Sequence, residues 1–533
     1  MYSPRAYNSL SNDKKAQLIP QPGMRVTVMG LGTHGGGLET VSYLLSRGAD
    51  LVVTDLKDEG KLAPTLEQID DKRIRFVLGH HEERDFSSAD MVVKNPAVPR
   101  RSPYLATARR VETDISLFLR EIGVFREIDG RRPTLVAWTG SKGKSTTAAA
   151  TAHIVSNAGL RCRLAGNITV SPLRYVDDDL AASVMVLELS SFQLGDLAFA
   201  AARSPVPFPA LSAFVAGITN IFPDHQDYYG SMEDYVADKR LIYADQSNDA
   251  WTVVGNDSYG RDFATDTPAK AVPLFDVGED AHGPGGAQPG GAEGTPYHAF
   301  ADPGAFYHGT EQVFLLPPRL LVSGPHNRRN VTAAAVAAYL AGVPAAAIPK
   351  AAASFTGIPH RLEYLGRIRG ADIYNDTAAT IPQATLRSLQ SFARPVHLVL
   401  GGTDKNLDLS VMPSIAEAAA SIHLLDGSAT RRMLEALGED TKGGAATTKA
   451  SGVAPRKMGG PFADLESAVR SAVAGAAAGD VVLFSPGAAS FELFHHEFHR
   501  GEEFKRVCHK LGLEPPTPPP LQSTAPAPST APL

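Results

Sequence analysis

Residues 139–146 have the composition and spacing of a phosphate-binding loop. The apolar run Thr134–Trp138 precedes them and a helix-like run, Ala148–Val155, follows, so we expect a strand, a loop and a helix. Glycines in the loop let backbone N–H groups face phosphate oxygens, and the helix N-terminus adds partial positive charge. Lys144 would contact the β- and γ-phosphates and Ser145 would bind Mg²⁺. A Gly-rich turn with surface lysines is the alternative.

The loop is a shortened form, because two residues separate Gly140 from Gly143 where the common loop has four. Downstream, Glu188 ends an apolar run, where a phosphate-loop fold places a residue that holds Mg²⁺, although it could simply cap the next helix. His225 follows a further strand-like run and has acidic neighbours, so it could bind a metal directly or through them. Lys239 lies in an amphipathic helical pattern, and this pattern alone favours a solvated surface lysine.

The elements that must position these residues alternate between strands and helices. The first segment reads as a strand, Arg25–Gly30, a Gly-rich turn, a helix to Arg47 and a strand that ends at Asp55, which is the layout of a nucleotide-binding Rossmann half. The turn 95–99 follows another strand, at the sheet edge where such folds bind ligands. Later strands are expected at 184–189, 213–221, 251–256, 372–375, 396–401, 421–425 and 480–485.

This alternation predicts an α/β protein of three domains. A Rossmann-like domain is expected at 1–132, a central phosphate-loop domain with a mostly parallel sheet at 133–354, and a Rossmann-like C-terminal domain at 355–514. The segment 278–294 is rich in Gly, Pro, Ala and Asp and predicts a disordered insertion. The stretch 515–533 is almost entirely Pro, Ala, Ser and Thr and predicts a disordered tail.

The bulk composition excludes several kinds of partner. The formal net charge of −6 and scattered arginines give no basic stripe, so nucleic acid is not expected. No apolar stretch is long enough for a signal peptide or a membrane span, and two cysteines favour a reducing compartment. We expect a cytoplasmic monomer that acts on small molecules.

Nine segments occur in the order seen in the Mur ligases, and the chain resembles that family over roughly residues 24–512. The segments 188–194, 360–361 and 485–490 favour the branch that adds D-glutamate, with a sister ligase for another amino acid as the alternative. The nine segments are 139–146, 188–194, 220–228, 235–243, 324–330, 355–361, 375–380, 400–405 and 485–490.

The resemblance implies an ATP-dependent amide ligase of peptidoglycan precursor synthesis. The carboxylate of UDP-N-acetylmuramoyl-L-alanine would attack ATP to give an acyl phosphate, from which the amine of D-glutamate would displace phosphate. Both steps develop negative charge on oxygen and therefore need cations. The resemblance assigns catalysis to Lys144, His225 and Lys239. It assigns two Mg²⁺ sites to Ser145, Glu188, His225 and a carbamylated Lys239.

The resemblance also implies the ligand contacts. ATP would be held by Gly140, Ser141, Lys142, Gly143, Lys144, Ser145, Thr146, Asn327, Asn330, Arg361 and Asp376. The UDP-linked substrate would be held by Gly32, Thr33, His34, Asp55, Asn167 and Ser190, and D-glutamate by Thr380, Lys405, Ser490 and Phe498.

Three positions depart from the family pattern. Ala378 stands where the family often has a lysine, Phe498 lies one place off the expected position, and the loop 33–37 is unusually Gly-rich. Two other classes of protein remain open from the residues alone. The first Rossmann unit by itself would fit an NAD-dependent oxidoreductase, and the phosphate loop would fit a non-catalytic nucleotide-binding scaffold.

Overall fold

The structure is a computed structural model that describes residues 11, 14, 18–32, 36–69, 71–128, 133–167, 170–178, 180, 182–275, 297–322, 324–404, 407–437, 457–490, 492–494 and 497–516. The expected insertion at 278–294 and all but the first two residues of the expected tail lie outside these ranges. The chain forms two compact units. Unit 1 comprises Met1–Pro318 and Ser323–Ala352, and unit 2 comprises Arg319–Val322 and Ala353–Leu533.

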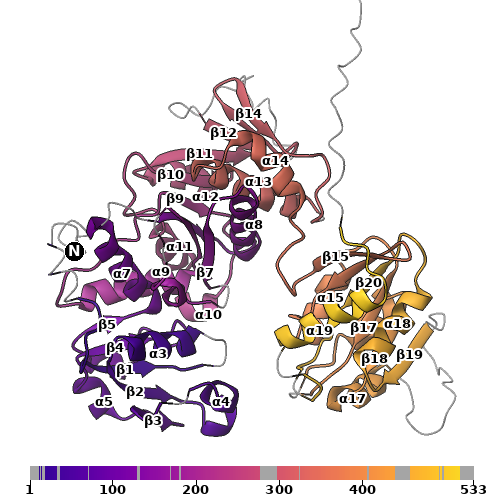
Figure 1. The fold of residues 1–533 in the computed structure, drawn as a ribbon, viewed down its shortest axis with the longest axis horizontal. Coiled ribbons are helices and arrows are strands. Elements are labelled where there is room, and N and C mark those ends of the chain that lie inside the picture. The colour runs from indigo at the N-terminus through magenta and orange to yellow at the C-terminus, as the bar shows by residue number, and fades with distance from the viewer. Residues whose placement is uncertain are drawn as a thin grey trace, which may run out of the picture. The chain divides into compact units, whose positions relative to one another are not determined.

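The first sheet of unit 1 has five parallel strands in the order β3-β2-β1-β4-β5 (Figure 1). The order reverses between β1 and β4, so the loops after these two strands flank the point where open α/β sheets bind ligands. The elements are β1 (Arg25–Met29), α3 (Gly36–Ser46), β2 (Asp50–Asp55), α4 (Glu59–Leu66), β3 (Ile74–Leu78), α5 (Glu83–Ser87), β4 (Met91–Lys94), α6 (Pro103–Thr107), β5 (Val111–Glu112) and α7 (Asp114–Ile128).

The central sheet of unit 1 has nine strands in the order β14-β13-β12-β11-β10-β9-β6-β8-β7. Its strands are parallel except for the antiparallel meander β12-β13-β14 at one edge. The strands are β6 (Thr134–Thr139), β7 (Cys162–Gly166), β8 (Val184–Glu188), β9 (Val215–Ile218), β10 (Trp251–Gly255), β11 (Lys270–Phe275), β12 (Tyr297–Phe300), β13 (Ala305–His308) and β14 (Glu311–Leu315). The helices are α8 (Lys144–Asn157), η1 (Pro172–Tyr175), α9 (Ser191–Arg203), α10 (Gln226–Tyr229), α11 (Met232–Arg240), α12 (Ser258–Asp266), α13 (Pro325–Leu340), η2 (Ala345–Ala347) and α14 (Ile348–Ala353).

One apolar core joins the two sheets of unit 1, since it contains Val53 of β2 in the first sheet and Leu187 of β8 in the central sheet, with Phe118 of α7. Strands such as β6 and β8 are buried along nearly their whole length, as expected for parallel strands covered by helices on both faces. The shared core holds the carboxyl edges of the two sheets in fixed positions, which is the condition for a common site.

The sheet of unit 2 has six strands in the order β15-β16-β20-β17-β18-β19, parallel except for the β15-β16 hairpin. Apolar clusters cover both of its faces. The elements are β15 (Glu363–Ile368), β16 (Ala371–Asn375), α15 (Pro382–Leu389), β17 (Val396–Leu400), α16 (Met412–Ala418), β18 (Ser421–Leu425), α17 (Ser428–Ala436), β19 (Lys457–Phe462), α18 (Leu465–Gly475), β20 (Val481–Phe484) and α19 (Glu497–Lys510).

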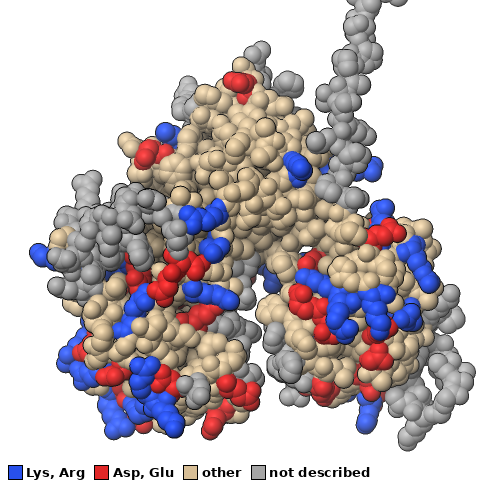
Figure 2. Space-filling view, viewed as in Figure 1, with Lys and Arg blue, Asp and Glu red and all other residues tan. Residues whose placement is uncertain are grey.

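The three sheets confirm the expected α/β class. Acidic and basic side chains are interspersed over the first sheet on the face shown in Figure 2, and the same mixture covers unit 2 there. Within the described ranges no helix is both long and apolar enough to cross a membrane. Cys162 and Cys508 are free thiols.

Candidate active site

The phosphate-binding loop connects β6 to α8 and is shaped by two glycines at which a Cβ would collide with a neighbouring side chain. Gly140 has φ +141°, and a Cβ there would lie 2.0 Å from Thr219 Oγ1. Gly143 has φ +84°, and a Cβ there would lie 2.6 Å from Asn330 Oδ1. Gly143 is also the N-cap of α8 and has no side chain to accept from the first-turn N–H groups. The helix N-terminus can therefore take an anion.

Neighbouring strand ends hold the loop in place. Ser141 Oγ accepts a hydrogen bond from Phe222 N at 2.8 Å and lies 2.9 Å from the Tyr235 hydroxyl. Lys142 N donates to Asn220 Oδ1 at 2.8 Å, and Lys144 Nζ donates to Ser141 O at 3.0 Å. The Ser141 hydroxyl thus fixes the loop from within.

Lys142 and Lys144 have different surroundings. The exposed ammonium of Lys142 pairs with Asp224 at 2.9 Å, and the nearby carboxylate of Asp224 has a lowered pKa although partial burial opposes that shift. Lys144 begins α8 and reaches back over its own loop. An ammonium in that position can neutralise charge on phosphate oxygens.

Glu188 is the last residue of β8 and is fully buried between β6 and β7. Its Oε1 accepts a hydrogen bond from Asn167 Nδ2 at 3.0 Å. Its Oε2 has no hydrogen-bond partner in the described part of the chain. A buried carboxylate oxygen without a donor is costly, whereas a hard divalent cation would satisfy it. The residue therefore fits a Mg²⁺ ligand.

The remaining metal candidates lie at the ends of adjacent elements. Ser145 is in the first turn of α8, and His225 is the exposed N-cap of α10, with its ring centroid 4.9 Å from that of Phe192. Among the described side chains, no three His, Cys, Asp or Glu residues converge as a metal cluster. Such a sparse donor set suits Mg²⁺, which keeps waters and uses one or two carboxylates together with phosphates.

Lys239 on α11 is buried, and only 1% of its surface is exposed. Its Nζ donates to Gly140 O at 2.8 Å and lies 4.5 Å from the centre of the Tyr235 ring. Burial, and then the positive charge of Lys144, lowers the pKa of Lys239 to about 7. The expectation of a solvated surface lysine, drawn from the helical pattern alone, is wrong, because this face of α11 packs against the phosphate loop.

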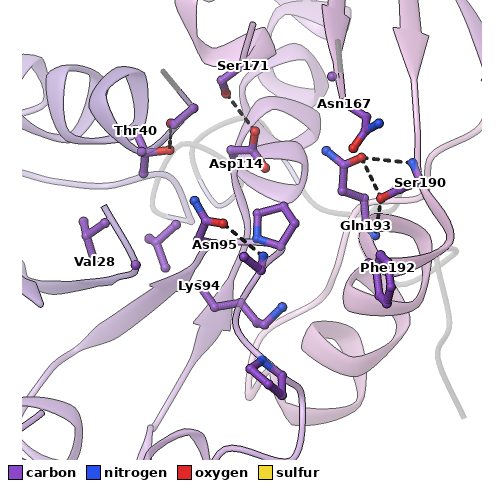
Figure 3. Close-up of a pocket in the computed structure, with 18 of the residues that line it drawn as sticks. Val28, Thr40, Lys94, Asn95, Asp114, Asn167, Ser171, Ser190, Phe192 and Gln193 are labelled. Atoms are coloured by element: carbon purple, nitrogen blue, oxygen red, sulfur yellow. Dashed lines mark hydrogen bonds between the residues drawn. The ribbon is translucent and has the colours of Figure 1, made fainter. Parts of the chain in front are cut away.

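A cavity of about 520 Å³ lies within unit 1, with walls from both of its sheets (Figure 3). Three of the expected site residues line it: Asn167, Ser190 and His225. Ser190 also caps α9 through a capping box with Gln193, so its position is set by the helix start. The sequence predicted a ligand-binding turn at 95–99, and Asn95 of that turn lines the cavity. Lys94, Asp114 and Ser171, which line the same cavity, were not predicted.

The expected uridine contacts lie at the carboxyl ends of β1 and β2. Gly32 N donates to Asp55 Oδ2 at 3.0 Å, and the other oxygen of Asp55 accepts from Lys57 N at 2.8 Å. Thr33 and His34 lie outside the described residues. In α13, Asn330 is buried against the phosphate loop, and Asn327 lies in the first turn of the same helix.

In unit 2 the expected residues gather at the carboxyl edge of the third sheet. Asp376 accepts from Leu362 N at 3.1 Å and from Ser485 Oγ at 2.7 Å, and burial raises its pKa. Ser490 is buried, and its hydroxyl has no hydrogen-bond partner among the described residues. Arg361 is exposed, and Thr380 is half-buried.

Two further positions qualify the expected D-glutamate pocket. Phe498 on α19 is 40% exposed, with its ring centroid 5.6 Å from that of His360, and Lys405 lies outside the described residues. Arg500, which the sequence analysis missed, is buried and donates to the carbonyl oxygens of Thr377 and Ala489. It ties the 485–490 loop to the segment that follows β16, and an arginine on a charged helix gives no sign of this role in the sequence.

Comparisons with known proteins agree along most of the chain. Residues 24–116 match the family model described as "Mur ligase MurD-like, N-terminal domain", residues 139–338 match "Mur ligase middle domain", and residues 360–487 match "Mur ligase, glutamate ligase domain". Two similar relatives are named UDP-N-acetylmuramoylalanine--D-glutamate ligase. The protein from Treponema pallidum (strain Nichols) is 36% identical, over 91% of this chain and 97% of the relative. The protein from Roseiflexus sp. (strain RS-1) is 35% identical, over 92% and 99%.

A solved structure of a UDP-N-acetylmuramate-alanine ligase from Thermotoga maritima aligns with a TM-score of 0.48 and 16% identity. The alignment covers 91% of this chain and 99% of that chain.

Proposed function

The chain belongs to the Mur ligase family, and from that membership we propose that it joins D-glutamate to UDP-N-acetylmuramoyl-L-alanine at the expense of ATP. The relatives that carry the name of this activity are 31–36% identical to the chain over about nine-tenths of its length. The reaction would supply a precursor of peptidoglycan.

The main support for the proposal is the cavity of unit 1, together with Glu188 and the phosphate loop that lie beside its wall. Its wall includes Asn167, whose amide is bonded to Glu188, and His225. Glu188 ends the strand beside β6, which leads into the phosphate loop. A substrate that filled this cavity could therefore present a carboxylate to the γ-phosphate of ATP held by that loop.

In the first step, an oxygen of the substrate carboxylate would attack the γ-phosphorus. The bond from that phosphorus to the ADP oxygen breaks, and an acyl phosphate and ADP are formed. Lys144 and the N-terminal amides of α8 supply positive charge where phosphate oxygens gain negative charge. Asn327 and Asn330 of α13, with Arg361 and Asp376 of unit 2, are the further residues that we assign to ATP.

In the second step, the D-glutamate nitrogen would attack the acyl carbon. The carbon–oxygen bond to phosphate breaks, and the amine loses a proton as the amide forms. We assign Thr380, Lys405, Ser490 and Phe498 to the amino acid. The buried hydroxyl of Ser490 supports this assignment, because it has no hydrogen-bond partner among the residues that the structure describes and is therefore available to a ligand.

Mg²⁺ would be held by Ser145, Glu188 and His225, and when bound it neutralises charge on phosphate oxygens. For Lys239 we propose carbamylation, in which its neutral amine adds to the carbon of CO₂ and loses a proton. Its burial supports this, as does the lack of any carboxylate within 4.0 Å of Nζ among the described residues. The product anion would support a second Mg²⁺. We also propose that the protein acts in the cytoplasm, as a monomer.

The test is ATP-dependent phosphate release with UDP-N-acetylmuramoyl-L-alanine, comparing D-glutamate with L-glutamate, L-alanine and meso-diaminopimelate. Release that depends on D-glutamate is expected. Release with another amine would make the protein a sister ligase, and no release with any of them would refute the proposal.

Lys144→Ala supplies the matching variant, since loss of the loop ammonium should reduce the rate by at least about a hundredfold. Lys350→Ala, at an exposed position on α14, is the control and should keep the wild-type rate.

A further inference from the structure

The wall of the cavity contains a carboxylate that the proposed chemistry does not use. Asp114 is the first residue of α7, at the carboxyl edge of the first sheet (Figure 3). Its Oδ2 accepts a hydrogen bond from Ser171 Oγ at 2.9 Å. Its Oδ1 is shielded from solvent and has no hydrogen-bond partner among the described residues. An acceptor in this condition is costly until a donor reaches it.

Ser171 holds this carboxylate in one orientation. Besides its bond to Asp114, it donates its backbone N–H to Glu39 Oε2 on α3 at 2.5 Å. The serine comes from the turn that leads into η1, so a residue of the central part of unit 1 ties together two carboxylates of the first sheet's helices. The free oxygen of Asp114 is therefore fixed before any ligand binds, which reduces the ordering cost of binding.

Asp114 also has no ion-pair partner within the part of the chain that the structure describes. The nearby cation Lys94 is buried and pairs with Asp196 of α9. Burial raises the pKa of the Asp114 carboxyl, although the Ser171 hydroxyl, the backbone N–H groups of Ile115 and Asp114 and the charge of Lys94 oppose that shift. What its Oδ1 lacks, among the described residues, is a hydrogen-bond donor.

The position of Asp114 in the cavity indicates which part of the ligand it meets. On one side lie Gly36, Gly37 and Thr40, at the N-terminus of α3, a position suited to a diphosphate. On the other side lie Asn167 and Ser190, next to Glu188, where the reacting carboxylate belongs (Figure 3). In a nucleotide-linked muramoyl substrate, the hexosamine is the group between the diphosphate and the acyl arm.

Building on the proposed function, we propose that Asp114 accepts a hydrogen bond from an N–H or O–H group of the hexosamine and so selects for a sugar-linked nucleotide over the free nucleotide. Asp114 is thus a specificity-determining residue of the substrate cavity. It distinguishes the full substrate from UDP alone, which has no group to place there.

Calorimetric titration of the whole protein tests this with UDP and with UDP-N-acetylmuramoyl-L-alanine. Asp114→Ala should weaken binding of the full substrate about ten- to a hundredfold, the range for a lost hydrogen bond to a charged group, and leave the Kd of UDP within about twofold. Asp114→Asn keeps an acceptor for Ser171 but places an N–H₂ group where Oδ1 was, so it should weaken the full substrate similarly. This isosteric variant decides the matter if the alanine variant does not fold.

Asp85→Asn is the control, because Asp85 on α5 is another buried carboxylate of the same domain, and it does not line the cavity. Its Oδ1 pairs with Arg75, and its Oδ2 has no hydrogen-bond partner among the described residues. Both affinities should stay at wild-type values in that variant. Equal weakening of UDP and full substrate by Asp114→Asn, or no weakening, would overturn the inference alone. Failure of the wild-type protein to bind the full substrate while it binds UDP would overturn the proposed function as well.

UDP-N-acetylglucosamine and UDP-glucose identify the donor. Wild-type preference for the first, abolished in Asp114→Asn, would assign the acetamido N–H. Similar binding of both sugars, weakened equally by the variant, would assign a hydroxyl group.

Discussion

Lys239 shows how burial prepares a single residue for chemistry. An ammonium taken out of water next to Lys144 loses much of its preference for the charged form, which is why its pKa falls to about 7. A neutral amine is the form that can react with CO₂. Lys239→Ala should therefore lower turnover by at least about tenfold, and bicarbonate, acetate or propionate should partly restore it by placing an anion in the space left.

The control for this rescue is Lys144→Ala, whose lost function is that of a cation. Short carboxylic acids should not restore its rate. If they restored both variants equally, or neither, Lys239 would not act as an anion.

The buried carboxylate of Glu188 predicts how strongly the reaction depends on Mg²⁺. Glu188→Gln keeps an oxygen for the bond from Asn167 but removes the charge that the unpartnered Oε2 carries. The Mg²⁺ concentration needed for half-maximal phosphate release should rise at least about tenfold, because an amide is a weaker ligand for a hard cation. An unchanged Mg²⁺ requirement would show that the carboxylate only positions Asn167.

Some residues of the site could be predicted from the sequence, and others could not. Lys144 and Glu188 could be found because each belongs to a motif that ends a recognisable strand. Asp114 and Lys94 could not, because each is one polar residue at a strand end, and its place in the cavity depends on helices distant in the chain. The burial of Lys239 was hidden by its charged neighbours Asp238 and Arg240.

At the scale of elements, helix α8 begins and ends at glycines that allow a matched comparison. Gly143 has φ +84° and Gly159, just beyond the other end, has φ +87°. A methyl group on Gly143 would strike Asn330, whereas nothing lies within 4 Å of one on Gly159. The positive φ should cost each Gly→Ala variant about 1 kcal/mol of stability, and the collision with Asn330 should add to the cost in Gly143→Ala. Gly143→Ala alone should raise the KM for ATP, by at least about tenfold.

Urea unfolding would measure the stabilities of the two variants, and steady-state kinetics would measure their KM values for ATP. An equal rise of KM in both variants would mean that backbone strain, and not the fit of the loop against α13, limits ATP binding.

A chain of hydrogen bonds across β17, β18 and α18 predicts that the free energy of unfolding depends on pH. His397 bonds to Asp480 and Ser421, Ser421 bonds to His423, and His423 bonds to Ser471. Burial, and then the charge of His397, lowers the pKa of His423 from 6.5 to about 4. The unfolded chain therefore binds a proton at this residue between about pH 6.5 and 4 that the folded chain does not. The free energy of unfolding should fall as the pH drops through this window, by at most about 3 kcal/mol from this group.

Unfolding in urea at pH 7.5 and pH 4.5 measures that loss. His423→Gln retains hydrogen-bonding groups but does not titrate, so its loss between the two pH values should be smaller. His509→Gln, at an exposed position on α19, should lose as much as the wild type. Equal losses of unfolding free energy in all three proteins would show that His423 does not cause the pH dependence.

The strands that could be predicted are those with apolar, β-branched runs long enough to stand out. Val184–Glu188 and Val396–Leu400 are examples, and both are central strands buried on each face. Cys162–Gly166 was missed because it is a half-exposed edge strand without such a run. The strand Lys457–Phe462 was missed because its Gly459, Gly460 and Pro461 have low β propensity. The segment is nevertheless a strand, because its pairing with β18 outweighs that low propensity.

For the whole molecule, the division into two compact units separates the residues that we assign to the two substrates. We assign the UDP-linked substrate to the cavity of unit 1 and D-glutamate to the carboxyl edge of the sheet in unit 2. Within unit 2, Arg500 donates to Ala489 O and to Thr377 O, so it ties the loop that contains Ser490 to the segment after β16. The Ser490 hydroxyl therefore has a fixed position.

This division predicts that the two half-reactions can be separated. Ser490→Ala should raise the KM for D-glutamate, about tenfold or more, because the change removes a buried donor, and acyl phosphate formation should continue. That step is measured without D-glutamate, by borohydride reduction of the acyl phosphate to an alcohol. Ser391→Ala, at an exposed position beyond α15, should alter neither step. If Ser490→Ala abolished acyl phosphate formation as well, the 485–490 loop would serve the phosphoryl transfer, and the assignment of D-glutamate to Ser490 would be wrong.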